Sequence, residues 1–284
     1  MPAFSGIWVA LVTPFADGEL DLPALQRLAR HLLDAGAAGL VACGSTGEAA
    51  ALSRDERLAV LDALLEVVPG ERLVMGLAGN NLNDVLGMLD AIQQRPIGGV
   101  LVPAPYYIRP SQAGLLNWFS RIADASRLPV ILYDIPYRTG ATLALDTLRQ
   151  LARHPRIVAL KDCGGDTGKT QALIADGQLA VLAGEDNQVF TTLCLGGSGA
   201  IAASAHHHTE RFVEMAACVQ RGDLARARAL AHSLQPLIEL AFAEPNPAPV
   251  KSLLALRGLI RDELREPMQP SSPALVERLR SLLV

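Results

Sequence analysis

The sequence predicts an α/β fold, a (β/α)8 TIM barrel followed by a C-terminal helical region. Three observations lead to this class. The chain has 284 residues, half of them hydrophobic, which is enough for one large core. Short apolar runs recur eight times, and each is followed by a segment with helical signals. Eight such units close a parallel barrel. The alternative is an open doubly wound sheet, but no G-x-G-x-x-G loop follows the first apolar run.

The apolar runs are nearly continuous rather than alternating, which is typical of strands buried on both faces. They lie at Trp8–Val12, Leu40–Cys43, Val74–Leu77, Val100–Val102, Val130–Tyr133, Val158–Lys161, Val181–Ala183 and Ala200–Ala202. Their ends are roughly 20 to 35 residues apart, which leaves room for one helix between successive strands.

Capping residues mark several of these helices. Helices are predicted after Asp21, after Ser53 and after Ser111, and Ser53 has Glu56 three residues later, which forms a capping box. Weaker patterns predict further helices at Asp84–Ile92, Leu145–Ala152, Thr167–Ala175 and Asn187–Leu195.

The last quarter of the chain is expected to be entirely helical from about Thr209 onward. Helical apolar spacing runs through Leu224–Leu240, Val250–Ile260 and Leu275–Leu283, with a rigid break at Glu244–Pro249. No low-complexity linker interrupts the chain. We therefore expect residues 1–208 to form the barrel that carries the site. Residues 209–284 would form the last barrel helix and a helical region packed on it.

The composition argues against several classes of function. A net charge of −4 offers no basic surface for nucleic acid, and the longest uncharged stretch, Asn187–His208, is too polar to span a membrane. The four cysteines form no C-x-x-C pair, which argues against disulfides or a zinc site and favours a cytoplasmic location. His206, His207 and His208 lack the i, i+4 spacing of metal ligands, so no metal is expected.

Two candidate residues lie at predicted strand ends, where TIM barrels carry their chemistry. Lys161 ends the sixth strand and is one of only three lysines. Burial lowers the pKa of an amine, and a neutral lysine forms Schiff bases with carbonyl compounds. An ion-paired lysine is the alternative. Tyr133 ends the fifth strand, where its phenol would either exchange protons in the same cavity or simply pack.

Two segments that follow strands could bind an anion. Gly44–Glu48 can present backbone N–H groups and two hydroxyls to a carboxylate or phosphate. Arg138, five residues after Tyr133, suits a carboxylate or a surface ion pair. A further glycine-rich segment, Gly196–Gly199, precedes the eighth strand and is expected at the opposite face, where features that stabilise the barrel gather.

These residues belong to a larger ordered set of motifs. The set comprises Gly44–Glu48, Tyr106-Tyr107, Tyr133, Ile135–Gly140, Lys161, Gly184–Asp186 and Asn246–Lys251. In order and spacing it resembles the dihydrodipicolinate synthase / N-acetylneuraminate lyase family of Schiff-base aldolases, over nearly the whole chain.

The resemblance implies a class I aldolase in which Lys161 forms an imine with pyruvate, without a metal or organic cofactor. It assigns catalytic roles to Lys161, Tyr133, Ser45 and Tyr107, and substrate-binding roles to Thr46, Arg138, Gly184 and Ile201. Tyr107 would be lent by a neighbouring subunit. The implied partners are therefore small-molecule substrates and further copies of the chain, in a homotetramer built as a dimer of dimers.

Arg138 favours one branch of the family. In that branch it holds the carboxylate of L-aspartate 4-semialdehyde, which is condensed with pyruvate to 4-hydroxy-tetrahydrodipicolinate in lysine biosynthesis. Ser45 points the other way, because the lyases carry serine where the synthases usually carry threonine. The alternatives are an N-acetylneuraminate lyase-like or other 2-keto acid aldolase with the same imine, and a catalytically idle binding homologue.

The resemblance also bears on feedback. Lysine often inhibits the bacterial synthases at a site near the loop after Glu48, near Asn80–Asp84 and near Tyr106. In this chain Arg54 and Arg57 stand where histidines can occur. Because like charges repel, we expect lysine to inhibit this protein poorly.

Overall fold

The computed structural model describes residues 4–283 and contains a closed barrel of eight parallel strands, as predicted. Its strands are β1 (Gly6–Ala10), β4 (Gly39–Ala42), β5 (Leu73–Gly76), β6 (Gly99–Pro103), β7 (Val130–Asp134), β8 (Ile157–Asp162), β9 (Ala180–Ala183) and β10 (Gly199–Ala202). Each predicted strand is confirmed. Successive strands are neighbours, and β1 closes the barrel against β10.

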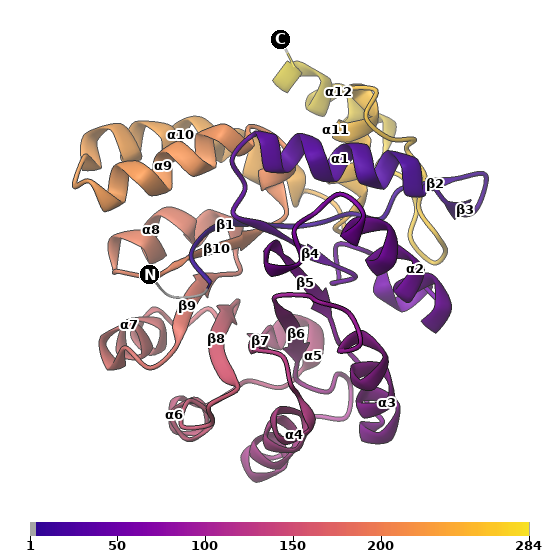
Figure 1. Cartoon of the computed structure of the whole chain (residues 1–284). Helices are drawn as coiled ribbons and strands as arrows, with labels where there is room; N and C mark the ends of the chain where they lie inside the picture. The colour runs from indigo at the N-terminus through magenta and orange to yellow at the C-terminus, as the bar shows by residue number, and fades with distance from the viewer. Residues whose placement is uncertain (1–3, 284) are drawn as a thin grey trace.

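Helices surround the strands, as Figure 1 shows. Those that connect barrel strands or follow the last one are α1 (Leu22–Asp34), α2 (Arg54–Leu65), α3 (Leu82–Ile92), α4 (Gln112–Ala125), α6 (Leu145–Leu151), α7 (Thr167–Asp176), α8 (Val189–Cys194) and α9 (Thr209–Gln220). The expected caps form, since the side chains of Asp21, Ser53 and Ser111 each accept a backbone N–H of the following helix. The capping box of Ser53 and Glu56 is complete.

Two short features were not anticipated from the sequence. A ribbon of β2 (Phe15–Ala16) and β3 (Glu19–Leu20) follows the first strand, and a single helical turn, α5 (Pro136–Thr139), follows β7. Both are too short for periodicity to show. The turn carries Arg138, one of the predicted site residues.

The C-terminal region contains α10 (Leu224–Ala241), α11 (Ala248–Leu256) and α12 (Pro273–Arg280). The expectation of an entirely helical segment from Thr209 onward is wrong for residues 257–272, which form a loop. Pro267 and Pro270 supply no backbone N–H, and Arg265 donates its backbone N–H to Glu48 instead of a helical carbonyl. In Figure 1 this loop, in yellow, passes beside β2–β3 and α2.

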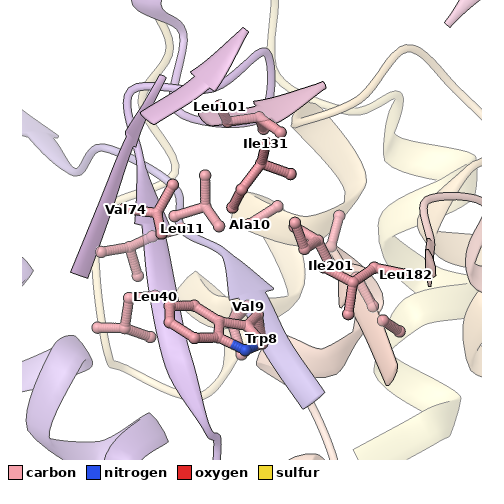
Figure 2. Close-up of a cluster of buried hydrophobic side chains, with 14 of the residues drawn as sticks. Trp8, Val9, Ala10, Leu11, Leu40, Val74, Leu101, Ile131, Leu182 and Ile201 are labelled. Carbon is pink, nitrogen blue, oxygen red and sulfur yellow. The ribbon is translucent and has the colours of Figure 1, made fainter. Parts of the chain in front are cut away.

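The barrel interior is filled by apolar side chains. Figure 2 shows Leu101, Ile131, Leu182 and Ile201, from four different strands, in one buried cluster. Filling the interior in this way makes the barrel a packed core, so substrates must enter at one end of the strands. All four cysteines are free. Among residues 4–283, no helix is both long enough and apolar enough to cross a membrane.

Candidate active site

Lys161 and Tyr133 lie side by side at the carboxyl ends of β8 and β7. They are register partners in the sheet, and the two-residue pleat places them on the same face as Ala159 and Ile131. Ile131 belongs to the interior cluster, so both side chains point into the barrel. The Lys161 Nζ lies 4.4 Å from the centroid of the Tyr133 ring, and the expected pairing across adjacent strands is confirmed.

Lys161 is buried, since only 5% of the residue is exposed. Burial lowers the pKa of Lys161, and the nearby Cys163, Asp186 and Glu185 oppose this shift only in part. No carboxylate oxygen lies within ion-pair distance of its Nζ in the described part of the chain. Both facts increase the neutral fraction of the amine, which is the nucleophilic form.

The phenol of Tyr133 is also buried, and burial raises its pKa well above the usual value. It therefore keeps its proton at physiological pH and can donate it. The Cys163 thiol donates toward the Tyr133 oxygen at a sulfur–oxygen distance of 4.0 Å. This places a polarisable group beside the phenol and next to Lys161.

The glycine loop (residues 44–48) follows β4, as predicted. Glu48 has a positive φ of 52°, and a Cβ on Gly47 would lie 3.0 Å from the backbone of Cys43 and Leu11. The tight course of the loop therefore depends on glycine. Thr46 is buried and its hydroxyl accepts the Asn246 side-chain N–H at 2.9 Å, whereas Ser45 is exposed.

One cavity, of ≈ 420 Å³, lies between the two segments that were predicted to bind an anion. Ser45, Tyr133 and Arg138 all line it, together with Arg57 and Tyr106. Lys161 does not line it, but its Nζ lies against the ring of Tyr133, which does. In residues 4–283 the hydroxyls of Ser45 and Tyr133 are not hydrogen-bonded to each other. The cavity can hold a small acid with a cationic group beside its carboxylate.

Four other predicted site residues do not line this cavity, and the buried Thr46 is one of them. A Cβ on Gly184 would be 2.9 Å from Lys161 Cγ and 2.4 Å from Cys163 Sγ, so the missing side chain leaves room for both. Ile201 is 1% exposed within the interior cluster. Tyr107 is 88% exposed, with a positive φ of 75°, and does not line the cavity of its own chain.

Comparisons with known proteins identify the family of this chain. The model of the dihydrodipicolinate synthetase family matches residues 3–283. The chain belongs to this family. A 4-hydroxy-tetrahydrodipicolinate synthase from Haloarcula marismortui is 37% identical over 284 residues, covering 99% of this chain and 93% of the relative.

Solved structures of the same kind superpose closely. The chloride-inhibited dihydrodipicolinate synthase from Acinetobacter baumannii, complexed with pyruvate, is 34% identical with a TM-score of 0.94, covering 98% of this chain and 97% of that one. A monomeric dihydrodipicolinate synthase variant is 32% identical with a TM-score of 0.95, covering 99% and 96%. The relatives therefore share the whole barrel and its C-terminal region with this chain.

Several residues of the site were missed by sequence reasoning. Asp186 is buried and accepts the backbone N–H and the hydroxyl of Ser204 at 2.6 and 2.5 Å. Cys163 contacts Tyr133, and Lys169 and Lys251 form buried ion pairs. Two signals were available. Asp186 and Lys251 belong to the ordered motif set, and lysine is scarce in a chain that otherwise uses arginine.

The first of the three consecutive histidines has a backbone partner at each ring nitrogen. His206 lies between the backbone N–H of Val12 and the carbonyl of Ala203, one at each ring nitrogen. No group of three His, Cys, Asp or Glu side chains is arranged to hold a metal ion within residues 4–283. His206 instead ties the end of the first strand to the segment after the last.

Proposed function

We propose that this site, the cavity together with the adjoining Lys161, condenses pyruvate with L-aspartate 4-semialdehyde to 4-hydroxy-tetrahydrodipicolinate, through an imine on Lys161. The observation that carries the proposal is the buried amine of Lys161, which has a lowered pKa, lies beside the Tyr133 phenol and has no carboxylate partner within residues 4–283. The reaction is a lyase-type step of lysine biosynthesis. We place it in the cytoplasm, where the four free cysteines stay reduced.

The first half-reaction uses pyruvate alone. The neutral Nζ of Lys161 attacks the keto carbon, the oxygen leaves as water, and an imine remains. Ser45 and Thr46, in the glycine loop, hold the pyruvate carboxylate. Tyr133 passes protons to the departing oxygen and takes part in removing one from the methyl carbon, which gives the enamine.

The second half-reaction forms the carbon–carbon bond. Arg138 holds the carboxylate of the semialdehyde while the enamine carbon attacks its aldehyde carbon. The amine of the semialdehyde then displaces Lys161 by transimination, and the ring closes. The scheme calls for no metal or organic cofactor, because the imine nitrogen itself accepts the electrons of the broken C–H bond.

We further propose that Tyr107 completes the proton relay of a neighbouring copy, in a homotetramer built as a dimer of dimers. The Tyr107 backbone N–H donates to the carbonyl of Thr139 at 3.0 Å, which fixes the segment to the turn that carries Arg138, while the side chain is exposed. Mixing Lys161→Arg and Tyr107→Phe subunits tests this. A relay across subunits predicts that the mixture is more active than either variant alone, and a relay within one chain predicts no gain.

The test of the imine is borohydride reduction in the presence of pyruvate, followed by mass measurement. We expect one pyruvate-derived adduct per chain, located on Lys161, and none on Lys161→Arg, which keeps the charge but cannot form the imine. Circular dichroism shows whether the variant is folded. If the wild-type chain forms no adduct, or if Lys161→Arg keeps substantial turnover, the imine mechanism is rejected.

A further inference from the structure

All three lysines of the chain are buried, with exposures of 5% for Lys161, 6% for Lys169 and 0% for Lys251. Lys161 has no carboxylate partner in residues 4–283, whereas Lys169 pairs with Asp134 and Lys251 with Glu48. Buried ion pairs are weak contributors to net stability, because desolvation offsets much of their attraction. Two such pairs beside one site therefore call for an explanation beyond stability.

The Lys251–Glu48 pair fixes the glycine loop. Glu48 is the last residue of that loop, and its other carboxylate oxygen accepts the backbone N–H of Arg265 at 3.1 Å. Lys251 also donates to the carbonyl of Glu263 at 2.7 Å. The loop that presents Ser45 and Thr46 is thus anchored at its end to the C-terminal region.

The Lys169–Asp134 pair fixes the arginine segment (residues 134–143), which holds Arg138 between its ends. Asp134 follows Tyr133 directly, so its carboxylate faces the opposite side of the sheet from the phenol. Lys169 Nζ lies 2.5 Å from one oxygen of Asp134, and the other oxygen accepts the backbone N–H of Leu143 at 3.1 Å. Lys169 also donates to the carbonyl of Leu143 at 3.2 Å.

A glycine leaves room for the Lys169–Asp134 pair. A Cβ on Gly164 would lie 2.6 Å from Lys169 Nζ and 2.8 Å from the Asp134 carboxylate. Lys169, Asp134 and the backbone of Leu143 therefore meet at one point. This point lies on the outer side of the sheet, away from the interior that Tyr133 faces.

We propose that Lys169 and Lys251 are positioning residues with separate tasks. The Lys251–Glu48 pair holds the loop that binds pyruvate, and the Lys169–Asp134 pair holds the segment that binds the second substrate. This rests on the proposed function of the two segments. Because a displacement of about 1 Å in a binding group can cost about 10²-fold in rate, loss of each pair impairs one half-reaction and spares the other.

The experiment compares two double variants, Lys169→Met/Asp134→Asn and Lys251→Met/Glu48→Gln. Each removes both charges, so neither leaves an unpaired buried ion, and each is the matched control of the other. Two quantities are measured: the rate of pyruvate imine formation by borohydride trapping without the aldehyde, and kcat/KM for the semialdehyde at saturating pyruvate.

For the Lys169 double variant we expect kcat/KM for the semialdehyde to fall by about tenfold or more, with imine formation within about twofold of wild type. For the Lys251 double variant we expect imine formation to fall by a similar factor. Lys169→Arg keeps a cation beside Asp134 and is expected to recover part of the loss, which also covers the case in which a double variant does not fold.

Equal losses in both half-reactions for both variants, or lower melting temperatures with unchanged kinetics, would overturn the proposal. So would a Lys169→Arg variant that loses both half-reactions alike. A failure of the proposed function can be told apart from a failure of the positioning roles, because in the first case the wild-type protein itself forms no pyruvate adduct.

Discussion

Consecutive residues at the ends of β7 and β8 serve two different purposes because the sheet sends them to opposite faces. Tyr133 and Lys161 face the interior and meet each other. Asp134 faces outward, where it meets Lys169. Lys169 has a carboxylate partner, whereas Lys161 has none in residues 4–283 and burial lowers its pKa. This difference favours the neutral form at Lys161, which is the form that the proposed mechanism needs.

The Tyr133→Phe variant tests the proton transfer. The phenyl ring keeps the contact with the Lys161 amine and fills the same space, so the fold should be preserved. Loss of the hydroxyl removes the acid/base group, and kcat should fall by about 10²–10⁴-fold. Steady-state kinetics with both substrates provide the measurement. If kcat stays near the wild-type value, another group supplies the proton.

The pH dependence of imine formation tests the state of Lys161. The neutral amine reacts, so the rate rises with pH and levels off above the pKa of Lys161. Because burial lowers that pKa, half of the maximal rate should be reached below the usual lysine value of about 10.4. Borohydride trapping rates over a pH series provide the curve. A midpoint at or above the value of free lysine would contradict the lowered pKa.

The Arg138→Ala variant tests which substrate the arginine segment recognises. Removing a charge-assisted pair to a carboxylate costs about 1.5–3 kcal/mol, and this loss should appear in kcat/KM for the semialdehyde. The rate of pyruvate imine formation should be unchanged. Arg138→Lys, which keeps the charge but lacks the planar fork, should lie between the two. An unaffected semialdehyde kcat/KM would favour an aldolase for a different 2-keto acid or aldehyde.

At the scale of elements, the strands and most helices follow from the sequence because each has a local cause. Buried parallel strands read as unbroken apolar runs, and helix starts carry their capping residues. The two buried lysine ion pairs have no local cause, because Lys169 and Asp134 are 35 residues apart in the sequence and Lys251 and Glu48 are 203 apart. Only the packing of α7 beside the end of β7, and of α11 beside the glycine loop, brings these partners together. Periodicity and spacing could not reveal them.

Helix α2 supports the expectation that lysine inhibits poorly. Arg54 donates to the carbonyl of Gly87 on α3, while Arg57 lines the cavity together with Tyr106. A bound lysine would bring its own positive charges next to Arg57, and like charges at close range repel. Activity is measured against lysine at saturating pyruvate, with Arg57→Ala expected to be the more sensitive form. Half-inhibition of the wild-type chain at sub-millimolar lysine would contradict the expectation.

At the scale of the whole molecule, contacts between distant parts of the chain close the barrel and complete the site. The first strand pairs with the last, and His206, after the last strand, accepts the backbone N–H of Val12 through its Nε2 at 3.2 Å. The C-terminal loop reaches the ribbon and α2, since Arg265 bonds to Gly18 and Glu56. The C-terminal region is therefore part of the structure that supports the glycine loop.

The buried His206 makes the fold sensitive to acid. It is 0% exposed, and burial lowers its pKa to about 4; its Nε2 accepts a hydrogen bond, so a proton there would also face the Val12 N–H. An unfolded chain takes up this proton near pH 6.5, and the folded chain only near its lowered pKa. The free energy of unfolding is therefore unaffected by His206 above pH 6.5. It decreases as the pH falls toward 4, and at pH 5 this residue accounts for a loss of about 2 kcal/mol.

Urea unfolding at pH 7.5 and 5.0 measures the loss. His206→Asn should remove that share of the pH dependence, whereas His232→Asn, at an exposed position on α10, is the matched control and should keep it. An equal pH dependence in wild type and His206→Asn would show that the fold tolerates a charged His206, and that the strand closure does not depend on its neutral ring.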